Sequence, residues 1–321
     1  MAPALSVVIP SRNAEATIGV QLGALAAQRA DVDWEVLVAD NGSSDGTRTV
    51  VERYRDRLPG LRVVEASGRR GPGHARNVGA AAASGRWLAF VDADDEVGEG
   101  WLQAVVDGLG QHDVIAGRFE VHRLNAPSVT RSRRPDQDTG LQYSPFGLAL
   151  PHAGAGNLAV TRAAFEAVGG FDVGLTCLED TDFCWRVQLA GHPLVFWPDA
   201  VVHVRLRSSL RRMWAQGRVY GAAAAELDHR YRDVAADAVP ARSRREPADP
   251  PPADVSPASS ASTDPRVAPA RSRLLPDPGH LVWVAGWHVG HRTWRPRSGP
   301  GPAPAAGIPA AGTRSARTSS L

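Results

Sequence analysis

Short apolar runs alternate with helical segments through the first ninety residues of the chain. The segment between the first two runs carries apolar residues at helical spacing, as at Ile18, Leu22 and Leu25. Repeated strand–helix–strand units of this kind predict a mostly parallel sheet that is covered by helices on both faces. The predicted strands are residues 5–9, 34–39, 61–65 and 87–91.

Polar residues follow three of these strands directly. Pro10 and Ser11 follow the first strand, Asp40 follows the second, and residues 92–95 follow the fourth. The carboxyl ends of parallel strands meet at one edge of a sheet, and ligands bind in the crevice outside that edge. We therefore expect these residues to lie along one rim of an α/β fold.

The fourth strand ends in three carboxylates, Asp92, Asp94 and Asp95. Like charges this close raise each other's pKa unless a positive charge lies between them. Asp92 and Asp94 are two residues apart and face the same side of an extended strand end. Hard oxygen ligands suit Mg²⁺ or Mn²⁺, so a divalent cation is one interpretation. The alternative is a structural turn, with Asp95 capping a helix over residues 97–109.

Composition excludes several functional classes. The formal net charge of the 321-residue chain is +2, and all 36 basic residues are arginine. This predicts no nucleic-acid partner and excludes a Schiff-base lysine. Cys177 and Cys184 give neither a disulfide framework nor a zinc site. The sequence has no evident signal peptide and no apolar window of about 18 residues, which predicts a cytoplasmic location.

Five sequence blocks occur in order along the chain. They are SVVIPSRNAEATI, VLVADNGSSDGT, GPGHARNVGAAAASGRWLAFVDADD, GNLAVTRAAFEAVGGFD and LEDTDFCWRVQLAGH. Together they resemble the inverting family-2 glycosyltransferases of GT-A fold, a family that includes many bacterial cell-surface polysaccharide enzymes. The resemblance covers residues 4–225. It implies a nucleotide-diphospho-sugar transferase fold with a Rossmann-like, mostly parallel sheet.

The resemblance assigns nucleotide binding to the first two strand ends and to the GPGHARN block. Pro10, Ser11 and Asp40 would hold the base and ribose, and Arg76 would reach a phosphate or the base-binding aspartate. The alternative is that residues 40–46 form only a turn, because Asn-Gly and Asp-Gly favour turns, and that Arg76 is a solvated surface residue.

The Asp-x-Asp pair matches the motif that binds metal and diphosphate in this family. Asp94 would be the direct metal ligand, and Asp92 would contact the ribose directly or the metal through water, with Ala93 between them in the nucleotide-sugar site. A bound Mg²⁺ or Mn²⁺ would neutralise the diphosphate and stabilise it as a leaving group.

The acceptor side follows from the later blocks. Asp180 matches the expected general base, with Glu179 as the alternate, and both could instead be ordinary acids at a helix N-terminus. His203 stands where many relatives carry a histidine near the metal, although a lone histidine on a strand is more often structural. Asn157 and Arg162 fall in the block that usually lines the acceptor side.

The implied reaction is transfer of a sugar from a nucleotide-sugar, with a UDP-sugar as the expected donor, to an acceptor hydroxyl with inversion. The acceptor would be a glycan or glycolipid in cell-surface polysaccharide or glycolipid synthesis. Two alternatives stay open: a polyprenyl-phosphate sugar transferase, and a sugar-nucleotide-binding protein without turnover. A nucleotidyltransferase is disfavoured because the Gly-rich, Lys-bearing loop of such enzymes is missing.

Composition changes after Val239 and predicts the domain organisation. Residues 240–278 are dominated by Pro, Ala, Ser, Arg and Asp and cannot bury enough apolar area to offset their ordering entropy. The predicted units are a glycosyltransferase domain over 1–238 (nucleotide-binding half 1–110, acceptor half 111–238), a disordered linker over 239–279, a Trp-rich amphipathic segment over 280–294 and a disordered tail over 295–321.

Two basic or aromatic segments suggest peripheral membrane contact. Basic and Trp-bearing amphipathic segments bind anionic interfaces, and residues 280–294 are rich in tryptophan. The alternative is a solvated helix face together with a segment that packs back on the domain. The basic residues are Arg205, Arg207, Arg211, Arg212 and Arg218.

Overall fold

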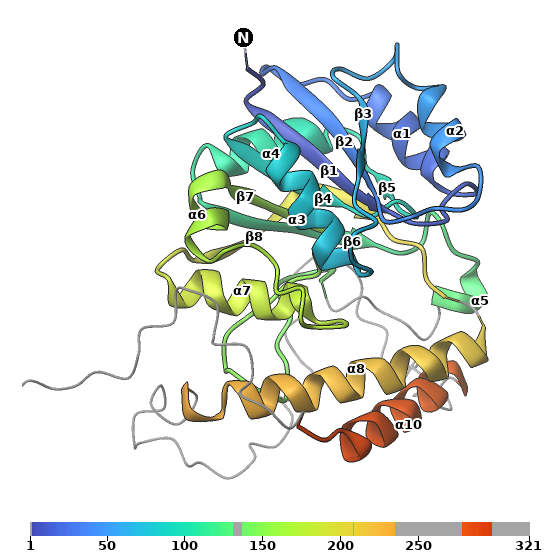
Figure 1. Cartoon of the computed structure of the whole chain (residues 1–321), viewed down its shortest axis with the longest axis vertical. Helices are drawn as coiled ribbons and strands as arrows, with labels where there is room; N and C mark the ends of the chain where they lie inside the picture. Colours follow the sequence, from blue (N-terminus) through green and yellow to red (C-terminus); the bar gives the residue numbers. More distant parts are fainter. Residues whose placement is uncertain (1, 131–136, 208, 235–277, 297–321) are drawn as a thin grey trace, which may run out of the picture.

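The computed structural model describes residues 2–130, 137–207, 209–234 and 278–296 (Figure 1). Within these residues one eight-stranded sheet runs in the order β3-β2-β1-β4-β7-β6-β8-β5. The strands are β1 (Leu5–Ser11), β2 (Trp34–Asp40), β3 (Arg62–Glu65), β4 (Trp87–Val91), β5 (Glu96–Val97), β6 (Val114–Glu120), β7 (Asn157–Thr161) and β8 (Leu194–His203). The helices are α1 (Ile18–Ala26), α2 (Thr47–Glu52), α3 (Pro72–Ala82), α4 (Trp101–Leu109), α5 (Pro127–Thr130), α6 (Arg162–Ala167), α7 (Glu179–Leu189), α8 (Leu210–Arg230) and α10 (Pro278–Thr293).

The first four strands pair in parallel, as the alternating pattern predicts. β1 lies between β2 and β4. The sheet extends from β1 through β2 to β3 on one side and to β4 on the other, so the strand order reverses at β1. Such a reversal of strand order opens a crevice at the carboxyl edge. Ser11, Asp40 and Asp92 stand at or just after these strand ends and therefore share one rim.

The second half of the sheet is mixed. β7 runs antiparallel to both of its neighbours, β4 and β6, whereas β6 and β8 are parallel. Residues Leu194–His203 form one long strand, β8. Its pairing shifts register between Gly117 and Arg118 of β6. Pro198 lies in this irregular stretch, where its missing N–H interrupts no ladder bond.

Helices cover both faces of the sheet, which confirms the layered fold. One buried cluster joins β1 and β2 to Leu22 of α1 and Leu102 of α4. The other joins β4 and β7 to Ala80 of α3, Phe165 of α6 and Phe183 of α7. The strand residues are buried on both faces, which explains why the early strands read as continuous apolar runs rather than as alternating patterns.

The Trp-rich segment forms α10, which lies alongside α8 (Figure 1). The two backbones approach closely because four glycines at the crossing carry no Cβ. A Cβ at Gly221 would lie 1.9 Å from the Trp287 carbonyl oxygen, and one at Gly290 would lie 1.9 Å from that of Arg218. The other two are Gly217 and Gly286. The segment thus packs back on the domain, as the second of the two interpretations expected.

Two expectations fall largely outside the described residues. The predicted linker over 239–279 lies there up to residue 277, and the predicted tail over 295–321 lies there beyond residue 296. None of the helices in the described ranges is long and apolar enough to cross a membrane.

Candidate functional site

The acidic loop after β4 brings three carboxylates together. Oxygen atoms of Asp92, Asp94 and Asp95 lie within 4.8 Å of one another, the one such cluster of potential metal ligands found in the described part of the chain. Burial and the charge of Asp92 raise the pKa of Asp94. Burial and both neighbouring carboxylates raise the pKa of Asp95 well above its usual value. A divalent cation would relieve this repulsion with ligands of the hard oxygen type that Mg²⁺ and Mn²⁺ prefer.

Asp95 does not cap a helix. The residues after it form the short strand β5, and α4 begins only at Trp101. Asp95 is buried and accepts a hydrogen bond from the backbone N–H of Arg205 at 2.8 Å. This contact joins the acidic loop to the segment that follows β8, so the expectation of a capping role was wrong.

Two arginines after β8 lie near the acidic loop. Arg205 Nε donates to the carbonyl oxygen of Asp94 at 3.1 Å. The positive charges of Arg207 and Arg205 act on the Asp94 carboxyl and oppose the rise in its pKa. From the sequence, both arginines were expected to belong to the basic surface of the following helix. The structure instead places them beside the carboxylates.

Gln21 of α1 supports the acidic loop through two hydrogen bonds, and it is not among the site residues expected from the sequence. Its side chain is fully buried, donates to the Asp92 carbonyl oxygen at 3.1 Å and accepts from the Val97 N–H at 2.9 Å. A signal was available, because Gln21 falls on the apolar stripe of its helix between Ile18 and Leu25. A buried amide on such a stripe needs polar partners.

Arg76 joins the two halves of the site. Its side chain is about 5% exposed, and Nη2 donates to Asp92 Oδ1 at 2.7 Å while Nη1 donates to Glu179 Oε1 at 2.8 Å. Burial disfavours the charged guanidinium, but the charges of Asp92, Glu179 and Asp180 outweigh it and raise the pKa of Arg76. The second turn of α3 thus places a permanent positive charge between the carboxylate that follows β4 and the one that begins α7.

Glu179 and Asp180 begin α7 after a strained residue. Leu178 has a φ of 59°, in the left-handed region that non-glycine residues seldom adopt. Burial and the Asp180 charge raise the pKa of Glu179, against the opposing charge of Arg76. Asp180 Oδ2 accepts from the Ala155 N–H at 3.2 Å and Oδ1 from the Thr181 N–H at 2.8 Å. Within the described residues the hydrogen bonds to Asp180 come from neutral backbone N–H groups, whereas Glu179 is ion-paired.

The predicted base-and-ribose residues lie at the ends of β1 and β2. Asp40 is fully buried, forms an ion pair with Arg48 and accepts from the Ser43 N–H at 3.0 Å. Ser11 is 2% exposed, and its hydroxyl lacks a hydrogen-bond partner among the described residues. Pro10 precedes it on β1, which continues through both residues rather than ending before them. A buried hydroxyl without a partner at a strand end is a candidate ligand contact.

Two residues expected on the acceptor side make hydrogen bonds within the protein, and their acceptor role stays a prediction. Asn157 is buried, accepts from Trp101 Nε1 at 2.9 Å and donates to the carbonyls of Arg118 and Ala200. Arg162 stands at the opposite end of β7 from Asn157 and donates to three carbonyl oxygens at the end of α3 and in the loop that follows it, those of Ala80, Ala83 and Gly85. Because β7 is antiparallel to β4, its C-terminal end points away from the rim.

His203 and Ala93 have different surroundings. Nδ1 of His203 lies 2.7 Å from Glu120 Oε2, and His203 pairs across the strands with Glu96. It is not part of the carboxylate cluster, and its metal-binding role stays a prediction. Ala93 is 6% exposed between the two aspartates, and its role in the nucleotide-sugar site stays a prediction.

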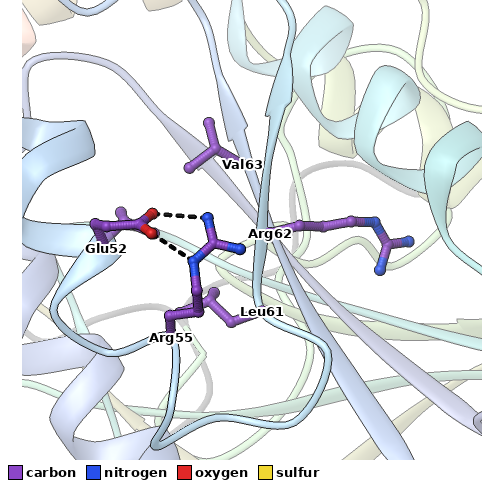
Figure 2. A pocket seen from close by; sticks show the side chains of 6 residues that line it. Glu52, Arg55, Leu61, Arg62 and Val63 are labelled. Carbon is purple, nitrogen blue, oxygen red and sulfur yellow. Dashed lines mark hydrogen bonds and ion pairs between the residues drawn. The ribbon is translucent and has the colours of Figure 1, made fainter.

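A shallow pocket away from the rim has no cluster of potential metal-binding or catalytic side chains. It lies between α2 and β3, where Arg55 donates two hydrogen bonds to Glu52 (Figure 2). Val51, Leu61 and Val63 form its apolar floor. Nothing in it converges on a ligand, so we assign it no function.

Comparison with known proteins identifies the family. The model of glycosyl transferase family 2 matches residues 6–169, just over half of the chain. The chain belongs to this family. Its matched region contains the rim residues, the acidic loop and Arg76, whereas Glu179 and Asp180 lie beyond it.

Two curated relatives are similar over much of the chain. One is the glycosyltransferase AglE of Haloferax volcanii, 31% identical over 203 residues, which cover 62% of this chain and 66% of that protein. Another is the pre-mycofactocin glycosyltransferase of Mycobacterium tuberculosis, 30% identical over 246 residues, which cover 73% of this chain and 50% of that protein. The chain therefore spans about half to two thirds of the length of these relatives.

A solved structure shows the fold. The mannosyltransferase PcManGT of Pyrobaculum calidifontis, described in complex with GDP-Man and Mn²⁺, superposes with a TM-score of 0.52 at 22% identity, over 70% of this chain and 63% of that one. The mixed sheet with its parallel N-terminal half is thus the GT-A fold, as the resemblance of the five sequence blocks implied.

Proposed function

We propose that this chain is a glycosyltransferase that moves a sugar from a nucleotide-sugar donor to an acceptor hydroxyl with inversion. The bridge from Asp92 through Arg76 to Glu179 carries the proposal. It fixes the acidic loop of the donor half beside the Glu179–Asp180 pair of the acceptor half. A direct displacement requires a leaving-group site and a base to be held in one rigid arrangement.

The donor diphosphate would bind at the acidic loop. The Asp94 side chain reaches solvent although the surrounding loop partly desolvates its carboxyl, and Asp92 is half-buried. Their oxygens lie within one cation's reach, so these two would hold Mg²⁺ or Mn²⁺. The cation would supply charge neutralisation for the departing diphosphate. Arg205 and Arg207 add fixed positive charge beside the same loop. The nucleoside would lie along the ends of β1 and β2, within reach of the Ser11 hydroxyl.

Asp180 is the better candidate for the general base. Glu179 is ion-paired with the Arg76 guanidinium, which occupies one of its carboxylate oxygens and holds the side chain in place. Asp180 is only partly buried and accepts from neutral backbone N–H groups. A carboxylate without a paired cation is free to accept the proton of an incoming hydroxyl.

A UDP-sugar donor and a glycan or glycolipid acceptor in cell-surface polysaccharide synthesis remain our expectation for the substrates. Transfer to a polyprenyl phosphate is the main alternative for the acceptor. A role in binding alone would not require a general base such as the Asp180 carboxylate. The expected place of action is the cytoplasm, at the inner face of the cell membrane.

Peripheral membrane contact would use the exposed side of the α8–α10 pair. Leu210 and Leu281 are 51% exposed, and Trp214 is 36% exposed. Arg211 and Arg212 are exposed in the first turn of α8. Apolar and basic side chains on one surface favour an anionic interface. Co-sedimentation with vesicles of anionic and of neutral lipid tests this, because equal partitioning of the protein to both would contradict it.

A donor screen tests the proposed function. Release of nucleoside diphosphate is measured from UDP-, GDP- and dTDP-sugars with Mn²⁺, Mg²⁺ or EDTA, for wild type, Asp94→Ala and Asp180→Asn. Asp56→Asn, at an exposed position on the turn after α2, is the matched control. We expect metal-dependent release from one donor. Asp94→Ala should lose donor binding, whereas Asp180→Asn should bind the donor and lose transfer. Full activity of Asp180→Asn would contradict the base assignment.

A further inference from the structure

Gly154 borders the proposed base, in the segment that leads into β7. A Cβ on this glycine would lie 3.0 Å from Cε2 and 3.2 Å from Cζ of Phe119, on β6, and 3.9 Å from Asp180 Oδ2. The space that a side chain would fill at residue 154 is therefore bordered by an aromatic ring edge and by a carboxylate oxygen. Gly154, Phe119 and Asp180 are each half-buried, so none of the three is closed off from solvent.

A buried amide holds the ring and the glycine together. Gln137 is fully buried, and its Oε1 accepts from the Gly154 N–H at 2.9 Å. Its backbone carbonyl accepts from the Phe119 N–H at 3.0 Å, and its Nε2 donates to the Gly117 carbonyl oxygen at 2.7 Å. The ring and the glycine thus keep fixed relative positions, and a ligand that binds beside them need not order them first.

The same segment reaches the acidic loop two residues later. The Ala155 N–H donates to Asp180 Oδ2 at 3.2 Å. A Cβ on Gly156 would lie 2.9 Å from Asp92 Oδ2. The segment therefore runs from the proposed base to the proposed diphosphate site, with Gly154 at the base end. An acceptor hydroxyl that gives its proton to Asp180 must lie at this end, on the face of the transferred sugar opposite the departing diphosphate.

The groups around Gly154 favour a neutral acceptor. A ring edge beside a carboxylate suits a group with an apolar C–H surface and a hydroxyl, because the ring contacts the carbon skeleton while the carboxylate accepts from the hydroxyl. A phosphate acceptor would instead bring a second negative charge next to Asp180, and like charges this close repel. A phosphate oxygen is also ionised already, so its attack requires no general base.

We propose that Phe119, Gly154 and Asp180 form the acceptor subsite, and that its occupant is a neutral saccharide hydroxyl and not a polyprenyl phosphate. This inference rests on the proposed glycosyl transfer. The acceptor oxygen bonds to the anomeric carbon, the bond from that carbon to the diphosphate breaks with its electron pair on the diphosphate, and the hydroxyl proton passes to Asp180. Phe119 contacts the acceptor sugar, and the missing side chain at Gly154 leaves room for it.

Two variants of the full chain test the subsite. Gly154→Ala puts a methyl group into the space beside the base, and Gly140→Ala is its control, because a Cβ there would meet nothing within 4 Å. Phe119→Leu removes the ring but keeps an apolar side chain. Phe146→Leu is its control, since that half-buried ring packs elsewhere, against α7, with ring centroids 6.3 Å apart. Urea unfolding shows whether each variant is folded.

Three reactions are measured for each protein. Transfer is followed to n-octyl β-D-glucopyranoside and to farnesyl phosphate, and donor hydrolysis is followed without an acceptor, so that water takes the acceptor's place. The donors are the UDP-, GDP- and dTDP-sugars of the screen, with Mn²⁺, and calorimetry gives Kd for each.

We expect Gly154→Ala to slow donor hydrolysis at least about tenfold, because the methyl group displaces the attacking water from its position beside the base. Its Kd for the donor should stay within about twofold of wild type. Phe119→Leu should raise KM for the glucoside about threefold to tenfold, the range of one aromatic contact. Both controls should match wild type, and wild type should not transfer to farnesyl phosphate.

The failure of this subsite is distinguishable from the failure of the proposed function. A wild-type hydrolysis rate in folded Gly154→Ala, or transfer by wild type to farnesyl phosphate, would overturn the subsite and leave the proposed function standing. Where Gly154→Ala does not fold, an unchanged KM for the glucoside in Phe119→Leu would overturn it instead. If wild type binds no donor, or binds one and never releases nucleoside diphosphate, the proposed function fails and this inference fails with it.

Discussion

Arg76 Nη1 donates to Glu179 Oε1 at 2.8 Å, across 103 residues of chain and between two buried side chains. The same guanidinium also holds Asp92. One arginine thus fixes the distance between the acidic loop and the start of α7. Because a buried charge is tolerated only when it is paired, each of the three groups depends on the other two.

Replacing Arg76 should abolish transfer and destabilise the fold together. Arg76→Gln leaves Asp92 and Glu179 as unpaired like charges, so we expect kcat/KM to fall at least about 100-fold and the free energy of unfolding to fall by about 3 kcal/mol. Kinetics and urea unfolding measure both. Arg57→Gln, an exposed arginine beside Tyr54, is the control. Wild-type activity in Arg76→Gln would show that the bridge is not needed.

A second buried ion pair lies within α7, and its aspartate also holds the end of α8 through a hydrogen bond. Asp182 is fully buried and accepts from Arg186 Nε at 2.7 Å and from the Tyr231 hydroxyl at 2.8 Å. Asp182→Asn removes the charge that balances Arg186, so we expect a loss of about 3 kcal/mol in unfolding free energy. Asp233→Asn, exposed just after α8, should change stability little. Equal unfolding midpoints for the two variants would contradict this anchor.

Acid stability should depend on Glu35 at the start of β2. Burial raises its pKa, but hydrogen bonds from the Ser84 N–H, the Ser6 hydroxyl and Arg62 outweigh this, and the pKa is lowered overall. A lowered folded-state pKa adds stability above the unfolded value of about 4.3, and that stability is lost as the pH falls through the folded-state value.

Glu35→Gln should therefore unfold at lower urea than wild type at pH 7, with a difference of about 1 kcal/mol. The difference should narrow as the pH falls below about 4. Unfolding curves at pH 7, 5 and 3.5 measure it, with Glu99→Gln on an exposed turn as the control. A difference that does not vary with pH would show that the Glu35 charge is not the cause.

The close crossing of α8 and α10 should not tolerate a side chain. Gly221→Leu would place a Cβ 1.9 Å from the Trp287 carbonyl oxygen, so α10 must move away. We expect faster proteolysis of the chain before α10 and a red-shifted tryptophan emission. Ala215→Leu, at an exposed position on α8, is the control. Unchanged proteolysis in Gly221→Leu would mean that the two helices do not pack in solution as described.

The sequence by itself determined the parallel half of the fold and the rim. A continuous apolar run indicates a strand that is buried on both faces, and apolar residues at helical spacing indicate a helix that is buried on one face. Both patterns can be recognised in the sequence alone. Asp40 and Asp92 stand at the predicted strand ends for this reason. The carboxylate cluster followed from residues at most three positions apart, because short spacing along a strand end fixes which side chains share a side.

Only the tertiary structure decided which distant side chains meet. The pairing of Arg76 with Glu179, the bracing by Gln21 and the place of Arg205 depend on contacts across 70 residues or more. The spacing of neighbouring residues along the chain does not indicate such long-range contacts. The position of Arg162 relative to the rim could not be predicted for the same reason, since the direction of β7 is set by its neighbours in the sheet. The packing of α10 against α8 could not be predicted from the sequence either. The glycines permit the two backbones to approach closely, but they do not specify which helices meet.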